Sequence, residues 1–301
     1  MRVTNQSLSN QVQESLQQTV RRLGAVQEQI ASGKRINRLS DDAFGAVRAL
    51  DLKSFDAALD QYRKNIDSAL PVLNQTDSVL GDVGDVLGRA KELALAMANG
   101  ALSAADRASA AAEVRQLSLR LVALGNAKFG NTYLFAGFKN GAAPFTPGVA
   151  VAYNGDGGAI DIQANSSTSV AVNLAGDRVF QGVGVAAGVD LFDTLADLET
   201  ALTADNVAGA NGITTQLGRL DAAANQVVNF RAEIGARVNT LNAAAQGLEV
   251  MQLKTADMRS KIEDIDTLKT YSDFARLQQA FQAALQSSAR VIQPSILDFM
   301  K

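Results

Sequence analysis

The sequence predicts a mainly α-helical protein, in which the N- and C-terminal parts form a long antiparallel helical bundle or coiled coil around a small inserted β-rich domain. From Leu52 an apolar or small residue returns at every seventh position for about seven heptads, and a second line runs beside it three residues further on. Another seven-residue ladder begins at Ile213. Each ladder is a narrow apolar seam that other long helices must cover. Between residues 131 and 190 the heptads give way to Gly, Pro and alternating apolar residues, which indicates the β-rich insert.

The seams are long enough to define individual helices. The first ladder is Leu52, Leu59, Ile66, Leu73, Leu80, Leu87 and Ala94; its companion line is Phe55, Tyr62, Ala69, Thr76, Val83, Ala90 and Met97; the later ladder is Ile213, Leu220, Val227, Ile234, Leu241, Leu248, Thr255 and Ile262.

Local signals predict where the first helices begin and end. An amphipathic segment over 5–33 should end at Gly33, because glycine readily adopts the left-handed conformation that terminates helices. Asp41 and Asp42 offer carboxylates to cap the long helix that begins near Ala43. Pro71 lies within that helix and predicts a kink or local loosening. Ser103-x-x-Asp106 resembles a capping box and opens a further helix.

The insert contains several short runs that alternate like strands. Residues 149–153 and 159–163 flank the Gly-rich segment 154–158, which predicts a β-hairpin between them. Residues 169–174 supply another strand, and 190–202 a short helix. We therefore expect four parts: an N-terminal assembly helix (1–42) that pairs with a C-terminal one (270–301), a long-helix rod domain (43–135 and 205–269), and the β-rich insert with its short helix (136–204).

Composition excludes several classes of function. The 301 residues contain neither Cys nor His, so disulfides, thiolate or imidazole metal sites and His-based catalysis are impossible. The formal net charge of −3 gives little support to nucleic-acid binding. The N-terminus lacks the apolar core of a cleaved secretory signal, and no apolar run is long enough for membrane insertion. Asp41–Asp42 reads as a helix cap rather than a metal pair, and we expect no catalytic residues, metals or cofactors.

The terminal segments each carry one apolar stripe that has two interpretations. The stripe is either an ordinary packing face within one chain or a coiled-coil surface used between chains on assembly, and the pattern alone favours neither. The candidate assembly residues are Val12, Leu16, Leu23, Val26, Ile30, Phe274, Leu277, Phe281, Leu285 and Ile292.

Several motifs, in this order and spacing, resemble the bacterial flagellin superfamily. They are the Ser-Gly-basic stretch in 31–37 followed by the paired Asp, the Tyr-Leu-Phe-Ala-Gly run in 131–137, and the Ser-Ile-Leu-Asp-Phe tail in 295–299. The opening Met-Arg-Val-Thr is similar to that of the family's hook–filament junction members rather than to flagellins. The resemblance covers about 1–145 and about 225–301 and is weak over the insert.

The resemblance implies a structural, non-enzymatic subunit located outside the cell in the flagellum, between hook and filament. Such proteins are exported unfolded by the flagellar type III route and polymerise through their terminal helices. Expected partners are copies of itself in a ring-like assembly, hook-associated protein 1, flagellin and an export chaperone. For the chaperone, the resemblance points to Ser295, Ile296, Leu297 and Phe299.

Three alternatives remain at this point. The chain could be flagellin itself, the bulk filament subunit, or a coiled-coil adaptor unrelated to flagella. A carboxylate-dependent enzyme or carbohydrate-binding module in the insert is the third, although residues 140–190 gather no acid–base pair and few aromatic side chains.

Overall fold

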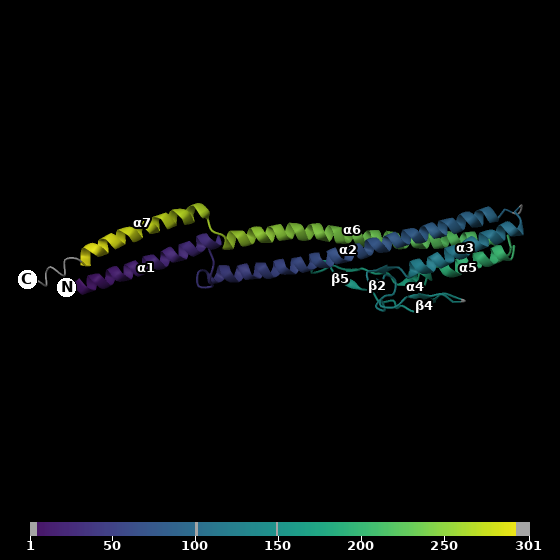
Figure 1. The fold of residues 1–301 in the computed structure, drawn as a ribbon, viewed down its shortest axis with the longest axis horizontal. Helices are drawn as coiled ribbons and strands as arrows, with labels where there is room; N and C mark the ends of the chain where they lie inside the picture. Colours follow the sequence, from purple (N-terminus) through teal and green to yellow (C-terminus); the bar gives the residue numbers. More distant parts are fainter. Residues whose placement is uncertain (1–4, 100–101, 149, 293–301) are drawn as a thin grey trace, which may run out of the picture. The chain divides into compact units, whose positions relative to one another are not determined.

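The computed structural model describes residues 5–99, 102–148 and 150–292, and it confirms a mainly helical fold with a small insert of short antiparallel strands (Figure 1). In chain order, the helices are α1 (Asn5–Ser32), α2 (Ala43–Met97), α3 (Ala104–Gly125), α4 (Gly176–Phe180), α5 (Leu191–Thr203), α6 (Ile213–Glu263) and α7 (Thr267–Ile292). The strands are β1 (Lys128–Phe129), β2 (Thr132–Tyr133), β3 (Phe145–Thr146), β4 (Ala152–Tyr153), β5 (Asp161–Gln163) and β6 (Ser169–Ala171). They form three separate antiparallel pairs, β1–β2, β3–β4 and β5–β6.

The chain divides into two compact units, which we call the terminal unit (Met1–Ala58 with Val250–Lys301) and the central unit (Leu59–Glu249). The hydrophobic core lies entirely in the central unit, since every buried residue of the main cluster falls between Leu59 and Leu248. Within the described part of the terminal unit, Ala49 is the only fully buried apolar side chain. The two units therefore differ in how much of their apolar surface they bury within one chain.

In the central unit, the heptad seams of α2 and α6 are buried as predicted. Ladder residues such as Leu73 on α2 and Leu241 on α6 are completely inaccessible to solvent. Ion pairs also join the two helices: Arg231 binds Asp77, with Nε 2.9 Å from the carboxylate, and Lys91 binds Asp221. Because the later residue of α2 pairs with the earlier residue of α6, the helices run antiparallel.

One residue of the companion line is not buried within the chain. Phe55 continues the companion line of α2, yet its side chain is 44% exposed. Phe55 lies in the terminal unit, where the described residues form no apolar cluster that could receive the ring. A regular period shows that a residue faces the seam, but it does not show that the seam is covered there.

Three helix ends carry local caps, of which those at Gly33 and at Ser103 with Asp106 confirm the sequence prediction. Gly33 follows α1 with a φ of 70°, a conformation that residues with a side chain rarely adopt. Ser103 and Asp106 form the reciprocal capping box that opens α3. Asp190 caps α5, because its carboxylate accepts hydrogen bonds from the backbone N–H groups of Phe192 and Asp193. Pro71 lies inside α2, which continues from Ala43 to Met97.

A cluster of aromatic rings anchors the insert to the helices. The ring of Phe145, on β3, lies 5.1 Å from those of Phe180 and Phe192 and 5.2 Å from that of Tyr153. Phe135 packs edge-on against Phe180, also at 5.1 Å. Aromatic rings at these separations attract one another in addition to burying apolar area. These contacts connect β3, β4 and α4 to α5.

The predicted hairpin between 149–153 and 159–163 is wrong. Instead, β4 pairs with the earlier strand β3, and β5 pairs with the later strand β6. The Gly-rich segment does not make a tight turn, because the carboxylate of Asp156 accepts hydrogen bonds from the backbone N–H groups of Phe138 and Gly158. Asn165 makes the competing turn, since its side-chain oxygen accepts from the N–H groups of Ser167 and Thr168.

Candidate assembly surface

The terminal unit is built on a helix pair, α1 and α7, which lie side by side along their length (Figure 1). The candidate residues of α1 are all half-buried: Val12, Leu16, Leu23, Val26 and Ile30. On α7, Phe274, Leu277 and Phe281 are half-buried, whereas Leu285 is 48% exposed. Ile292 ends α7, but its side chain and the proposed chaperone contacts Ser295, Ile296, Leu297 and Phe299 lie outside the described residues.

Pairing of two helices covers the apolar stripe only partly. A helix with a single neighbour can bury only the strip facing that neighbour, so the flanks of the stripe stay in contact with water. None of the described candidate residues reaches the complete burial of Leu73 in the central core.

Small and polar side chains leave a gap in the same helix pair. Val12 and Ser15 on α1 face Ala284 and Ser287 on α7 around a space of about 340 Å³. Natural helix interfaces within a closed core are packed much more tightly than this. The helix pair therefore has room for further side chains along its length.

The parts of α2 and α6 within the terminal unit also expose apolar side chains. On α2, Phe44 is 79% exposed, Leu50 66% and Val47 54%, while Ala49 on the other side of the helix is buried. On α6 the exposed members are Val250, Met251, Leu253 and Met258. Large apolar side chains that gather on one part of a surface mark interaction sites, whereas scattered ones do not.

Backbone hydrogen bonds tie the α1–α2 turn to the α6–α7 turn. The N–H of Arg35 donates to the carbonyl of Glu263 at 2.6 Å, and the N–H of Ile265 donates to the carbonyl of Gly33 at 3.1 Å. This short antiparallel bridge also brings Lys34 opposite Asp264. The guanidinium of Arg35 adds a hydrogen bond of 2.9 Å to the carbonyl of Ile262. We call this pair of turns the joint.

A nearly buried carboxylate lies at the centre of the joint. The side chain of Glu263 is only 6% exposed, and its two oxygens bind the ammonium groups of Lys34 at 3.2 Å and Lys53 at 2.5 Å. Burial by itself raises the pKa of Glu263, but the hydrogen bonds from Lys53 and Lys34 outweigh burial and lower it below its ordinary value. The carboxylate is therefore charged at neutral pH and connects α6 with both the α1–α2 turn and α2.

Of the two aspartates predicted to cap α2, Asp42 has that role and Asp41 does not. The carboxylate of Asp42 accepts a hydrogen bond from the N–H of Gly45 at 2.8 Å in the first turn of α2, and it binds Arg35 at 3.1 Å. These contacts, the Gly45 bond first, lower the pKa of Asp42. Asp41 accepts from the N–H groups of Asn37 and Arg38 within the preceding turn.

The sequence patterns did not predict the joint or the exposed apolar residues of α2. Nothing near Lys34 and Arg35 in the sequence indicates their partner, because Glu263 is far away along the chain and no local pattern links them. Phe44, Val47 and Leu50 do leave a local signal, since they are apolar residues three apart that do not belong to the heptad ladders. A search for helices with two apolar faces would have found them.

Comparison with protein families matches most of the chain. Residues 3–140 match the bacterial flagellin N-terminal helical region, and residues 217–300 match the bacterial flagellin C-terminal helical region. The first match contains α1, α2, α3, β1 and β2, and the second contains α7 and most of α6. The segment between the two matches carries the rest of the insert and α5.

Individual proteins of known name are similar over most of their length. Flagellar hook-associated protein 3 of Escherichia coli is 30% identical over 86% of this chain and 87% of its own. Flagellar hook-associated protein 3 of Salmonella typhimurium is 27% identical over 95% and 96% of the two chains. Among solved structures, a putative flagellar hook-associated protein from Vibrio parahaemolyticus has a TM-score of 0.66 at 20% identity, over 74% of this chain and all of that one.

Proposed function

This chain belongs to the bacterial flagellin family, in the group of flagellar hook-associated protein 3, and from that premise we propose that it is a structural subunit of the flagellum. In this proposal the subunit joins the hook to the flagellin filament at the cell exterior and polymerises through its terminal helices. It forms a ring-like assembly with its own copies. It contacts hook-associated protein 1 on the hook side and flagellin on the filament side. Its role is mechanical rather than enzymatic.

The observation that carries the proposal is the unfinished burial in the terminal unit. Its described part contains one fully buried apolar residue, Ala49, beside half-buried stripes on α1 and α7 and exposed side chains on α2 and α6. Complete burial of a side chain such as Leu16 contributes about 1.5–3 kcal/mol. Neighbouring subunits can supply that burial, whereas a single chain does not. The interpretation of the stripes as surfaces between chains is therefore the one we favour.

The four parts expected from the sequence give the proposal its layout. The terminal segments 1–42 and 270–301 form the layer that assembles, the segments 43–135 and 205–269 form the rod, and 136–204 is the insert. The candidate assembly residues all belong to the first of these layers.

Export is part of the same proposal. The chain is proposed to leave the cell unfolded without a cleaved signal peptide, and the absence of Cys means that it can change redox compartment without forming disulfides. No helix in the described ranges is long and apolar enough to cross a membrane. An export chaperone is proposed to bind the C-terminal segment. Deletion of 275–301 should abolish chaperone binding in a pull-down, and retained binding would refute this part.

The experiment that tests the function is deletion of the gene followed by complementation. Cells without the protein should have hooks but no filaments, with unpolymerised flagellin in the medium. A chain carrying Leu16→Asp and Leu23→Asp should fail to restore filaments, because the new charges lie on the stripe that faces other helices. The matched control, Gln17→Asp with Gln27→Asp, adds the same charge to exposed positions of α1 and should restore them. Normal filaments in the deletion strain would overturn the proposal.

The nearest alternative is that the chain is flagellin, the bulk filament subunit. The abundance of the protein in sheared filaments distinguishes the two functions. A junction subunit should be scarce in sheared filaments, whereas flagellin should be the dominant protein there. Quantitative mass spectrometry of sheared filaments measures this ratio directly.

A further inference from the structure

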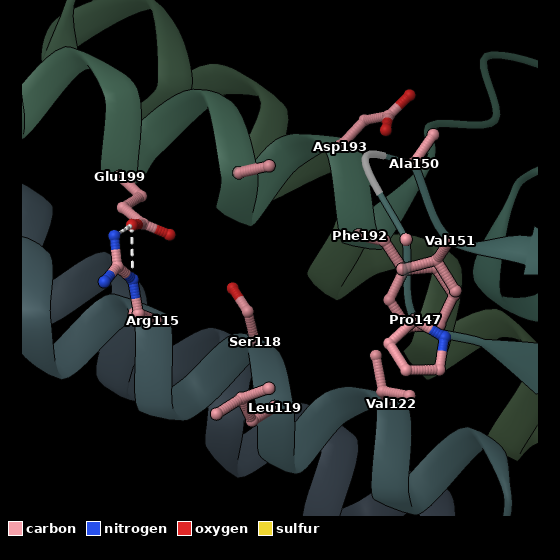
Figure 2. A pocket seen from close by; sticks show the side chains of 12 residues that line it. Arg115, Ser118, Leu119, Val122, Pro147, Ala150, Val151, Phe192, Asp193 and Glu199 are labelled. Atoms are coloured by element: carbon pink, nitrogen blue, oxygen red, sulfur yellow. Dashed lines mark hydrogen bonds and ion pairs between the residues drawn. The ribbon is translucent and has the colours of Figure 1, made fainter.

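A cavity of about 200 Å³ lies between α3, α5 and the loop residues 147–148 and 150–151 in the central unit (Figure 2). Its walls are mainly apolar and include Leu119 and Val122 of α3, Phe192 of α5 and Val151 of the loop. Figure 2 shows Arg115 and Glu199 joined at one side, where their ion pair of 2.6 Å bounds the space. Leu119 is 55% exposed, so the apolar wall continues onto the surface.

Two polar groups at this cavity, one buried and one exposed at the rim, bear on what could occupy it. The hydroxyl of Ser118 points into the space in Figure 2, is buried, and has no hydrogen-bond partner among the described residues. A buried polar group without a partner costs free energy, so such groups are uncommon in folded proteins. At the rim, Asp193 makes no ion pair with any residue that the structure describes, and its charge gives the rim a negative excess.

The volume of the cavity indicates the size of its occupant. Small-molecule sites usually measure about 300–1,000 Å³, whereas an engineered apolar cavity of about 150 Å³ binds benzene. A space of about 200 Å³ therefore fits one phenyl ring better than a larger organic ligand.

The insert presents a phenyl ring of this kind. Phe138 is 65% exposed, although its backbone is held firmly: its N–H donates to the carboxylate of Asp156 at 2.7 Å, and the preceding Gly137 has a φ of 67°. Its ring lies against Gly158, where an added Cβ would come within 2.0 Å of the ring. Aromatic side chains, Phe included, are enriched in protein interfaces relative to the rest of the surface.

Charge complementarity favours Phe138 as the occupant. The next residue, Lys139, is exposed and makes no ion pair with any described residue. Its ammonium would match the unpaired carboxylate of Asp193 at the rim. Phe138 does not line the cavity of its own chain, and its exposed ring can contact a second copy.

We propose that the ring of Phe138 in one copy of this chain seats in the α3–α5 cavity of a second copy, with Lys139 beside Asp193. The seated segment also brings main-chain carbonyl groups that can accept the hydrogen bond of Ser118. The contact joins two different surfaces, so it propagates from copy to copy and closes as a ring or continues as a helix. It rests on the proposed function in one respect, which is that copies of the chain stand next to each other.

The contact is weak when it acts alone. One side chain in one cavity buries far less than the roughly 1,200 Å² of a stable interface, so its contribution depends on other contacts that hold the copies together. Crosslinking, which traps short-lived encounters, is therefore the appropriate assay.

The absence of Cys from the chain permits a selective crosslinking experiment on the purified full-length protein. A chain with Asn140→Cys is mixed with a chain with Ala196→Cys, a position that lines the cavity, and treated with a short bismaleimide. The control partner carries Val228→Cys, which is 60% exposed on α6. We expect the cavity pair to crosslink at least about tenfold faster than the control pair, and Phe138→Ala to remove most of that excess.

Charge reversal gives the second readout. Lys139→Asp and Asp193→Lys should each slow crosslinking of the cavity pair, and a mixture of the two variants should restore it, as coupled partners do. Equal rates for the cavity and control pairs, an unchanged rate with Phe138→Ala, or failure of the mixture to restore crosslinking would each overturn the proposal. These rates are measured without a flagellum, so their failure is distinguishable from failure of the gene-deletion experiment.

Discussion

Replacement of Glu263 by Gln tests whether its charge holds the joint of the terminal unit together. The substitution preserves the size of the side chain but removes the negative charge that binds Lys34 and Lys53. The glutamate is 6% exposed, whereas each lysine side chain is 44% exposed and can regain water when its partner is lost. The cost is therefore above that of an exposed ion pair and below that of a fully buried one, at about 1–3 kcal/mol.

Hydrogen exchange measures that cost locally. The amides of Arg35 and Ile265 make the hydrogen bonds that join the two turns. Because each 1.4 kcal/mol corresponds to a factor of about ten, their protection should fall about 5- to 150-fold in Glu263→Gln. The matched control is Asp257→Asn on the same helix, whose ion pair with Lys261 is exposed on both sides and should change protection less than about threefold.

Two results would refute this reasoning. Unchanged protection in Glu263→Gln would show that the charge of Glu263 contributes nothing to the joint. An equal loss in Asp257→Asn would show that the effect is a general response of α6 to lost charge rather than a property of the buried carboxylate.

Three further predictions follow from burial and pKa. Leu220→Ala, at a side chain 1% exposed in the core, should lower the free energy of unfolding by about 2–5 kcal/mol in urea titrations, while Val228→Ala, 60% exposed on the same helix, should change it by less than about 0.5 kcal/mol. Because the pKa of Glu263 is lower in the folded state, its stabilisation is present above the ordinary value of 4.5 and is lost as pH falls through the folded pKa. Hydrogen exchange of the joint should therefore lose more protection on acidification in the wild type than in Glu263→Gln; parallel losses would contradict this. Burial raises the pKa of Tyr153 to about 12, so Tyr153→Phe should remove the latest phase of the ultraviolet tyrosine titration, and loss of an earlier phase would contradict the assignment.

The sequence predicted those features whose causes are local. The seams of α2 and α6 repeat every seven residues and are buried throughout the central unit, because a helix places such residues on one face regardless of its partners. Caps such as the pair Ser103 and Asp106 depend on atoms within one turn, and their residues stand next to each other in the sequence. Gly33 belongs to the same class.

Features that depend on distant partners were missed or wrongly assigned. β4 pairs with the earlier strand β3 rather than with β5, and alternation within a strand carries no information about which neighbour it pairs with. The contact of Glu263 with Lys34 joins opposite ends of the chain. For the candidate assembly residues, the sequence predicted the apolar stripe. How much of that stripe is buried depends on how many helices surround α1 and α7, which the sequence pattern does not show.

Immunogold electron microscopy of intact flagella tests the central proposal most directly. An antibody against the insert, which is remote in sequence from the assembling terminal segments, is applied to hooks with attached filaments. Gold should be confined to a short zone between the hook and the filament. Gold distributed along the whole filament would contradict it, because that pattern belongs to flagellin.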